Sequence, residues 1–339
     1  MEVLTVGRVI VDIYANELHR PLEEVETFSK YLGGSAANIA VGLARLGHRC
    51  GLISRVGNDG HGRFLRRYLE ESGVDTRFVG VDPRYRTGLA FAALFPPQDS
   101  HVLFYRDPCA DTNVQLADLD VETVLNARML VVTGTALAKS PLRETVLYLL
   151  RGRKRRGALN VMDIDYRPVL WADPTDCLLY YDLALRMCDV LIGNEVEIAF
   201  AAAAVRLAGE PGGVGAGLER LAGSDKPAKE ELERMARSLV EAGASQVVVK
   251  LGPEGAMAIT PEGSLQVPGF RVQVVNTLGA GDGFAAGYCA GLLRGWPLEK
   301  CLEYGNATGA IVVSRHGCAP AIPTREELEL FLRERKKAS

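Results

Sequence analysis

The chain has 339 residues, of which 47% are hydrophobic and 24% charged, a composition typical of globular proteins that excludes disordered and fibrous classes. Its formal net charge of −3 gives no electrostatic reason to expect a nucleic acid or an acidic membrane as a partner. Its seven cysteines include no C-x-x-C pair, and neither a signal peptide nor an apolar run of membrane-spanning length is recognisable, so we expect a cytoplasmic protein with reduced thiols.

Short β-branched runs alternate with amphipathic helical stretches along most of the chain. This alternation is typical of α/β proteins, and we expect a doubly wound, mainly parallel sheet flanked by helices, in a single domain over residues 1–330. The expected strands cover residues 4–10, 50–56, 129–133, 160–164, 190–193, 246–250 and 256–259. The expected helices include residues 36–46, 62–71, 143–151, 229–242 and 283–293.

Three stretches depart from this alternation. Residues 13–31 and 86–106 are strand-like without an intervening helix, and we expect them to form a small β-lid over one edge of the main sheet. Residues 201–229 pass from an alanine-rich helix end into a glycine-rich run, which predicts a flexible surface insertion.

Some apparent motifs fail on their context. The basic run at residues 151–156 lies at an expected helix end, where basic side chains favour the helix dipole and solvent. The glycines at 213–217 follow no strand and do not have the spacing of a dinucleotide fingerprint. The sequence contains no P-loop, and its histidines form no pair with the spacing of zinc ligands.

The strongest functional signal is the turn Gly279-Ala280-Gly281-Asp282, which follows a strand-like run over residues 272–275 and opens a helix. Glycines at such a turn let the backbone approach an oxyanion, and the free N–H groups of a helix start favour negative charge. Asp282 falls beside this anion hole. It either stabilises the helix start or accepts the proton of a hydroxyl group that attacks a phosphorus atom held in the hole. The pattern favours phosphoryl transfer.

The same segment resembles one signature of the PfkB/ribokinase family of sugar kinases. The segment Gly33-Gly34-Ser35-Ala36-Ala37-Asn38 is similar to the family's other signature, and the resemblance extends from Val3 to Thr324. It implies a ribokinase-like fold with a β-lid, and ATP as the phosphate donor. It also implies that Asp282 is the catalytic base and that Gly279, Ala280 and Gly281 form the anion hole.

The resemblance further implies a metal site. Asn194 and Glu197 match an N-x-x-E motif that holds Mg²⁺, largely through water, and Mg²⁺ prefers such oxygen ligands. The alternative is an ordinary helix start with Asn194 as its N-cap. Asn276 stands where many family members have Asp, next to backbone that often lines a monovalent-cation site. The missing charge puts a requirement for K⁺ in doubt.

For the nucleotide, the resemblance points to one loop and one helix position. Lys250, Gly252 and Gly255 match the loop beside the nucleotide, and Asn306 resembles a position near the adenine. The alternative interpretation of the loop is a hairpin turn, in which the two glycines serve the backbone.

On the acceptor side, the resemblance implies that sugar hydroxyl groups bind near Asp12, Gly33, Gly34 and Asn38. We expect Asp12 at the end of the first strand, facing the crevice where the strand order reverses. Arg106 and Arg167 indicate a sugar acid, because a guanidinium group binds a carboxylate through two parallel hydrogen bonds and a neutral sugar needs no such group. For either arginine the alternative is a structural ion pair.

Taken together with the two arginines, the resemblance implies an ATP-dependent kinase that phosphorylates the terminal hydroxyl of a keto-deoxy sugar acid. A kinase of 2-dehydro-3-deoxygluconate, fructose or ribose remains open, as does a non-catalytic sugar-binding regulator on the same fold. An NAD-dependent dehydrogenase is disfavoured, because residues 7–10 lack a glycine fingerprint after the first strand. The expected partners are a small sugar or sugar acid and, through the lid, a second copy of the chain.

Overall fold

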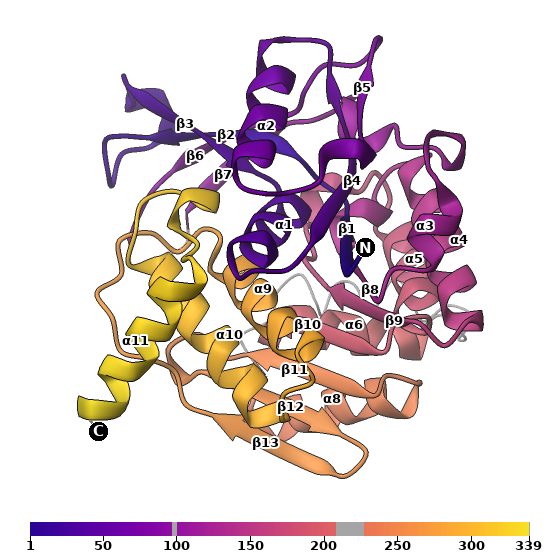
Figure 1. Cartoon of the computed structure of the whole chain (residues 1–339), viewed down its shortest axis with the longest axis vertical. Helices are drawn as coiled ribbons and strands as arrows, with labels where there is room; N and C mark the ends of the chain where they lie inside the picture. The colour runs from indigo at the N-terminus through magenta and orange to yellow at the C-terminus, as the bar shows by residue number, and fades with distance from the viewer. Residues whose placement is uncertain (97–99, 208–226, 339) are drawn as a thin grey trace.

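The computed structural model describes residues 1–96, 100–207 and 227–338 (Figure 1). These residues form a nine-stranded sheet in which neighbours are parallel except at one edge, where the last two strands are antiparallel. In spatial order the strands are β13 (Gly263–Val267), β12 (Ala256–Thr260), β11 (Gln246–Lys250), β10 (Val190–Asn194), β9 (Leu159–Asp163), β8 (Met129–Thr133), β1 (Val3–Val6), β4 (Cys50–Gly57) and β5 (Val79–Asp82).

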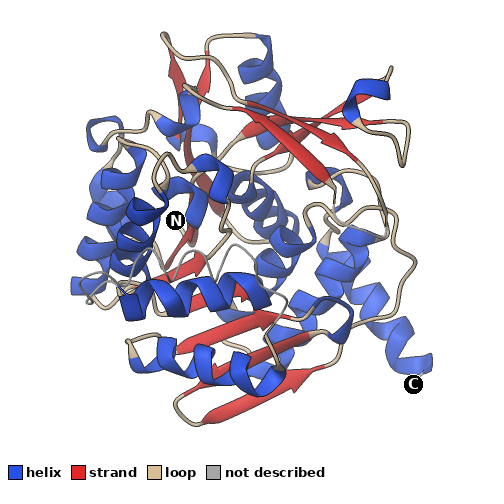
Figure 2. Cartoon of the chain, turned by 180° about the vertical axis from the view of Figure 1, so that it is seen from behind, coloured by secondary structure: helices blue, strands red, loops and turns tan. Residues whose placement is uncertain are grey.

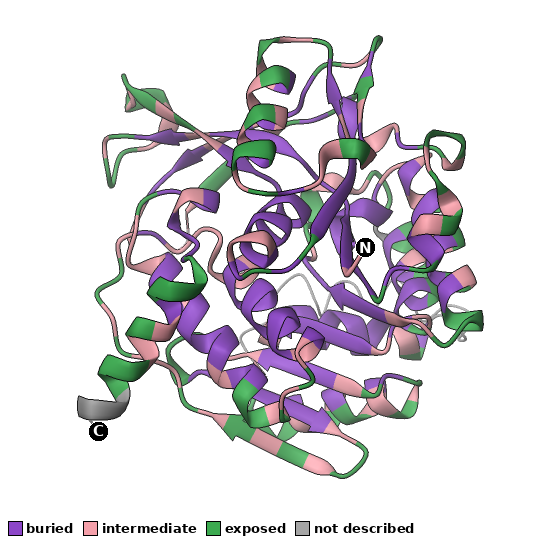
Figure 3. Cartoon of the chain, viewed as in Figure 1, coloured by how far each residue is buried: buried purple, intermediate pink, exposed green. Residues whose placement is uncertain are grey.

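Helices cover both faces of this sheet, which explains why its central strands are continuous runs of buried β-branched and aliphatic residues (Figure 3). One face carries α1 (Ser35–Arg45), α2 (Gly60–Glu71), α9 (Ala280–Leu293) and α10 (Leu298–Val313), with α11 (Arg325–Ala338) packed on α10. The other carries α3 (Val121–Leu125), α4 (Leu142–Arg155), α5 (Pro174–Leu185), α6 (Glu195–Leu207) and α8 (Lys229–Glu241) (Figure 2). The expected doubly wound α/β fold is confirmed. Of the helices formed by the described residues, none is long and apolar enough to span a bilayer.

A second, smaller sheet lies beside the first, as the two helix-free stretches predicted (Figure 2). Its order is β3 (Phe28–Gly33), β2 (Ile10–Ala15), β6 (Leu89–Ala93) and β7 (His101–Tyr105). Only the β2–β6 pairing within this described sheet is parallel; the two outer pairings are antiparallel. We call this element the small sheet.

Two expected strands differ from the structure. The strand expected over residues 4–10 divides, because Gly7 adopts a φ of +146° and the chain passes from β1 in the large sheet to β2 in the small one. The strand expected over residues 272–275 is absent. The N–H groups of Val275 and Asn276 both donate to the carbonyl of Val313, at 2.7 and 3.1 Å. This segment is therefore hydrogen-bonded to the end of α10 instead of pairing with a strand.

The expected surface insertion is wrong at its beginning. Residues 201–207 are the last two turns of α6, and most of their small side chains are buried against the core. The alanines of this segment allow α6 to pack closely against the core, and the helix does not fray there. Lys229, the last residue of that insertion, is the first of α8. Residues 208–226, including the glycine-rich run, lie outside the described part of the chain.

Candidate active site

Polar residues gather where the strands of the large sheet end. Arg8 follows β1, Asp163 ends β9, Asn194 ends β10 and Lys250 ends β11. The parallel register sets Thr133 beside Asp163 and Asn194 beside Lys250, so these residues come from neighbouring strand ends. In open α/β sheets, ligands bind outside the carboxyl ends of the strands, where the strand order reverses. Here that point is β1, which lies between β8 and β4.

The expected glycine turn is present at the start of α9. Gly279 is the N-cap with a φ of +82°, and a Cβ atom there would lie 2.8 Å from the Cys318 sulfur. The N–H groups of the first turn have no intrahelical acceptors and favour an anion. A Cβ atom on Gly281 would lie 3.2 Å from Nζ of Lys250, so the ammonium group faces the same space. The helix begins at Ala280, three residues before its expected start.

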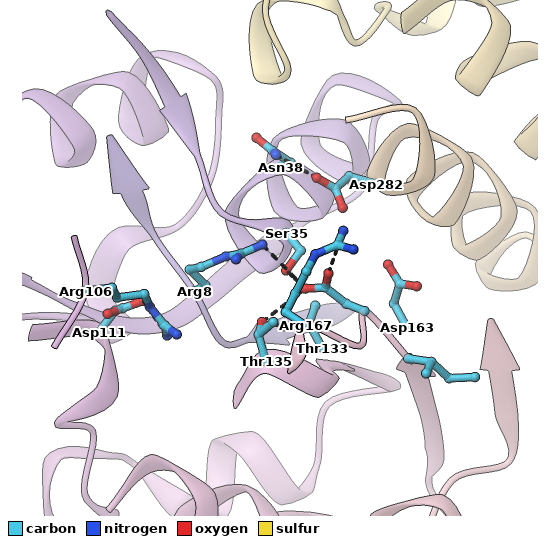
Figure 4. A network of polar contacts seen from close by, with 12 residues as sticks. Arg8, Ser35, Asn38, Arg106, Asp111, Thr133, Thr135, Asp163, Arg167 and Asp282 are labelled. Carbon is cyan, nitrogen blue, oxygen red and sulfur yellow. Dashed lines mark hydrogen bonds and ion pairs between the residues drawn. The ribbon is translucent and has the colours of Figure 1, made fainter. Parts of the chain in front are cut away.

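Asp282 lies in that first turn and faces α1. Nδ2 of Asn38 donates to its Oδ2 at 2.7 Å, and Figure 4 shows the two side chains pointing toward each other. Burial and the nearby carboxylate of Asp165 raise the pKa of Asp282 above its ordinary value, against the opposing effects of Asn38, Arg8 and Lys250. This carboxylate can therefore accept a proton more readily than an exposed one.

Asp12 lies within β2 of the small sheet, and its expected place at the end of the first strand is wrong because that strand divides. The Tyr14 hydroxyl donates to Oδ2 of Asp12 at 3.1 Å and lies 2.6 Å from the Cys318 sulfur. Burial raises the pKa of Asp12 to about 7, against the pull of Arg8 and of the hydrogen bond from Tyr14. The small sheet thus carries a second carboxylate into electrostatic range of Asp282.

Gly33 and Gly34 make room for neighbouring protein groups. A Cβ atom on Gly33 would overlap the carboxylate of Asp12, and one on Gly34 would overlap the carbonyl of Arg8. Gly34 also adopts a φ of +98°. Gly33 therefore allows β3 to approach β2 closely, and Gly34 allows the start of α1 to approach the segment just before β2.

The two arginines expected to bind a sugar acid have different surroundings. Arg106 is buried, and its Nε and Nη2 lie 2.9 and 2.8 Å from Oδ2 of Asp111. Arg167 is about half exposed, and its Nη2 lies 3.1 Å from Oδ1 of Asp165. In Figure 4 the Arg106–Asp111 pair stands to one side, whereas Arg167 lies between Asp282 and the strand ends. The structural-pair alternative fits Arg106, and Arg167 remains available to a ligand.

Arg8 and Asp165 were not predicted from the sequence as site residues. Asp165 is 4% exposed and accepts hydrogen bonds from the hydroxyls of Ser35 and Thr135, at 2.6 and 3.1 Å. Nη2 of Arg8 lies 3.5 Å from its Oδ2. Two signals in the sequence could have pointed to them. Arg8 is a charged residue two positions after a buried strand, and Asp165 is the second acid in Asp163-Ile164-Asp165.

Asn194 and Glu197 form reciprocal hydrogen bonds at the start of α6. The Asn194 side chain accepts from the Glu197 N–H at 2.9 Å, and the Glu197 carboxylate accepts from the Asn194 N–H at 2.8 Å. Nζ of Lys250 lies 3.0 Å from Asp163 and 3.6 Å from Glu197. Burial lowers the pKa of Lys250, but the two carboxylates outweigh it and hold that pKa above the ordinary value. Lys250 is a permanent cation between them.

The expected nucleotide loop follows β11. Gly252 and Gly255 have φ values of +58° and +95°, and a Cβ atom on Gly255 would overlap the carbonyl of Val267. Nδ2 of Asn306 donates to that carbonyl and to the carbonyl of Pro268, at 3.1 and 3.2 Å. The backbone of the loop therefore forms the hairpin turn of the alternative interpretation. The side chain of Asn306 connects α10 to the end of β13 through hydrogen bonds.

The chain resembles known proteins over almost its whole length. A sequence profile described as pfkB family carbohydrate kinase matches residues 1–325. The 5-dehydro-2-deoxygluconokinase of Geobacillus kaustophilus is 40% identical over 341 residues, covering 100% of this chain and 96% of that relative. A PfkB protein from Polaromonas sp. JS666 has a TM-score of 0.78 and 30% identity, covering 97% of this chain and 99% of that one. A candidate ribokinase II from E. coli, solved with ATP and Mg²⁺, has a TM-score of 0.82 and 25% identity, covering 98% and 99%.

Proposed function

The chain belongs to the pfkB family of carbohydrate kinases, and we propose that it transfers the γ-phosphoryl group of ATP to the terminal hydroxyl of 5-dehydro-2-deoxy-D-gluconate. The observation that carries the chemistry is Asp282, a carboxylate of raised pKa in the first turn of α9, beside the glycine turn. A non-catalytic sugar-binding regulator would need no proton acceptor there. The names of the similar kinases favour this acceptor over 2-dehydro-3-deoxygluconate, fructose and ribose.

In the proposed mechanism, one group of residues holds the acceptor and takes its proton, and another holds the transferred phosphoryl group. Asp12 and Asn38 hold the acceptor, and Asp282 takes the proton of its hydroxyl as the bond to phosphorus forms. The N–H groups at the start of α9 hold the oxygens of the transferred group. Since the transition state of phosphoryl transfer is loose, an ionised carboxylate is a sufficient base. The nucleotide would lie beside four residues, Lys250, Gly252, Gly255 and Asn306.

The residues at the ends of β9 and β10 fit a hydrated Mg²⁺ ion. The described residues contain no cluster of three or more acidic, histidine or cysteine ligands, so the ion would be held through water near Glu197 and Asn194. Carboxylate oxygens already surround a cation there, the ammonium group of Lys250. When bound, Mg²⁺ neutralises charge on the phosphate oxygens. Asn276 is a poorer ligand for K⁺ than an aspartate would be. Its Oδ1 already accepts a hydrogen bond from the Leu278 N–H, and its buried Nδ2 is a donor.

Product analysis tests the proposed reaction. Incubation with Mg-ATP and 5-dehydro-2-deoxygluconate should yield one phosphate monoester and one ADP per acceptor. In a proton-coupled ³¹P spectrum the phosphorus should couple to two protons, because the terminal carbon is a CH₂ group. Coupling to a single proton would mean transfer to a secondary hydroxyl and would contradict the assigned position.

Removing the charge of Glu197 should weaken metal use specifically. Glu197→Gln keeps an oxygen that can accept from the Asn194 N–H, so the helix start is preserved. We expect a several-fold rise in the Mg²⁺ concentration needed for half-maximal activity, with metal-free calorimetric binding of the acceptor unchanged. Glu195→Gln removes a charge from the same helical turn and is the matched control. An unchanged Mg²⁺ requirement in Glu197→Gln, or metal-independent turnover of the wild type, would refute the metal site.

We also propose that two copies of the chain associate through the outer face of the small sheet. The register places Ile13, Phe91 and Leu103 side by side on one face, with Tyr105 next to them. Leu103 is 48% and Tyr105 61% exposed, and Phe91 packs edge-on against Tyr105 with ring centroids 5.6 Å apart. Ile13 and Phe91 are partly buried, so Leu103 and Tyr105 are the exposed members of this apolar group, and exposed apolar side chains that lie together mark interaction surfaces.

Sedimentation should detect this association. We expect the wild type to sediment as a dimer at micromolar concentration and Leu103→Glu to sediment as a monomer, because a charge in the buried interface would be unpaired. Leu330→Glu alters an equally exposed leucine on α11 and should leave the dimer intact. A monomeric wild type would rule out a dimer formed through the small sheet.

A further inference from the structure

Two guanidinium groups share one buried carboxylate in this site. Nη2 of Arg167 lies 3.1 Å from Oδ1 of Asp165, and Nη2 of Arg8 lies 3.5 Å from its Oδ2. Figure 4 shows Arg8 and Arg167 converging from two sides, with Ser35 above and Thr135 below the point where they meet. One negative charge is thus set against two positive charges, and the group of three has a local charge of +1.

Asp165 is held firmly in place. Its backbone has a φ of +34°, a conformation that residues other than glycine rarely adopt, and its side chain is 5% exposed. The hydroxyls of Ser35 and Thr135, from α1 and from the segment after β8, both donate to its Oδ2. Strained backbone fixed by surrounding contacts is characteristic of functional sites. Burial raises the pKa of Asp165, but the two arginines and these hydroxyls outweigh it and hold the pKa below its usual value.

Arg8 has donors that the described residues leave unused. It is 7% exposed, and its Nε and Nη1 have no hydrogen-bond partner in the described part of the chain. Its guanidinium group lies over the ring of Phe104, 5.2 Å from the centroid, a favourable cation–π contact. A buried guanidinium with unpaired N–H groups is unfavourable unless a ligand supplies the acceptors.

Arg106 differs from Arg8 in the pairing of its charge, although its buried Nη2 also forms no hydrogen bond within the described residues. Its Nε donates to Asp111 at 2.9 Å, its Nη2 lies 2.8 Å from the same oxygen, and both side chains are almost fully buried. The charge of Arg106 is therefore balanced within the protein. Arg8 and Arg167, in contrast, share the single carboxylate of Asp165, so their two positive charges are only half balanced by it.

We propose that Arg8 and Arg167, held side by side by Asp165, bind the carboxylate of the acceptor, and that Arg106 supports the fold. This inference rests on the proposed function, since it assumes an acidic acceptor. Arg8 also acts electrostatically on Asp12 and Asp282, which places it within range of the carboxylates that handle the acceptor's hydroxyls. Asp165 is a positioning residue, and Arg8 and Arg167 determine specificity.

Kinetics of three variants test this assignment. Arg8→Lys keeps a charge but loses the planar fork, and Asp165→Asn keeps the shape but loses the charge that aligns the two arginines. Both should raise KM for 5-dehydro-2-deoxygluconate roughly ten- to a hundredfold and change kcat less than threefold. Kinetics with fructose, a neutral acceptor, should be nearly unaffected in both. Arg106→Lys, the control, should lower the melting temperature and leave the ratio of acid to neutral kcat/KM unchanged.

The outcomes separate the possible sources of the bound anion. If Arg8→Lys lowers kcat equally for acid and neutral acceptors, the guanidinium groups serve the transferred phosphoryl group and the inference is overturned. An unchanged KM for the acid in both Arg8→Lys and Asp165→Asn would overturn it as well. If the wild type phosphorylates only neutral sugars, the proposed acceptor fails first and this inference fails with it. Fructose kinetics also reveal general damage to the fold, which would affect both acceptors.

Discussion

Replacing Asp282 by Asn should lower kcat by roughly two to four orders of magnitude, the usual contribution of a general base. The substitution keeps the shape of the side chain, and the amide oxygen can still accept from Nδ2 of Asn38. Binding of Mg-ATP, measured by calorimetry, should be nearly unchanged, because the glycine turn and Lys250 remain. A variant that retains more than about a tenth of wild-type turnover would contradict the assigned role.

The raised pKa of Asp282 gives this prediction a second readout. Burial and Asp165 favour the protonated form, and only the ionised form can accept a proton. The acidic limb of the kcat profile should therefore lie above the range of an exposed aspartate, with activity lost as the pH falls through that pKa. Asn38→Ala should move this limb further toward high pH, because the hydrogen bond from Asn38 stabilises the carboxylate. A limb that moves the other way would contradict this electrostatic account.

The largest loss of stability is expected at Arg153, far from the site. Its side chain is fully buried, and Nη1 donates to the carbonyls of Val124, Leu125 and Ala127 at 2.8, 3.2 and 2.8 Å. Nη2 donates to the Leu159 carbonyl at 2.9 Å, and Nε to the Asn160 side chain at the same distance. Burial lowers the pKa of Arg153 to about 10, so it stays charged at neutral pH. It satisfies a set of buried acceptors at the end of α3.

Arg153→Met should lower the free energy of unfolding by about 3–5 kcal/mol, because several buried acceptors lose their donor at once. Urea denaturation measures this loss. Arg155→Met alters an exposed residue of the same basic run and should change stability by less than about 0.5 kcal/mol. If the two variants were equally stable, Arg153 would not organise this corner of the fold.

Arg153 also shows why the sequence alone misled us about the run at residues 151–156. Basic side chains near a helix end are usually solvated, and Lys154, Arg155 and Arg156 are indeed exposed. The burial of Arg153 depends on carbonyl groups from α3 and β9, which local sequence does not reveal. Local sequence also does not reveal that the chain leaves the large sheet at Gly7 to form β2, because the partner strand β3 begins only at Phe28.

The candidate site is predictable from the sequence where its geometry depends on neighbouring residues in the chain. The turn at Gly279–Asp282 needs small residues and an acid in consecutive positions, and it was found from those residues alone. The environments of Arg8 and Arg106 depend on contacts between segments, which periodicity does not detect. Asp165, which contacts Arg8, lies 157 positions away from it in the chain. Asp111 lies only five positions from Arg106, but this spacing is not one at which helical side chains meet, and the two residues pair through the loop that follows β7.

The most direct test of the proposed function is a coupled ADP-release assay of the wild-type protein with Mg-ATP and a panel of acceptors. The panel contains 5-dehydro-2-deoxygluconate, 2-dehydro-3-deoxygluconate, fructose and ribose. We predict that kcat/KM is highest for 5-dehydro-2-deoxygluconate and at least tenfold lower for the neutral sugars, which cannot use the charge-assisted hydrogen bonds of Arg8 and Arg167. Higher kcat/KM for fructose or ribose than for both acids would contradict the proposed acceptor.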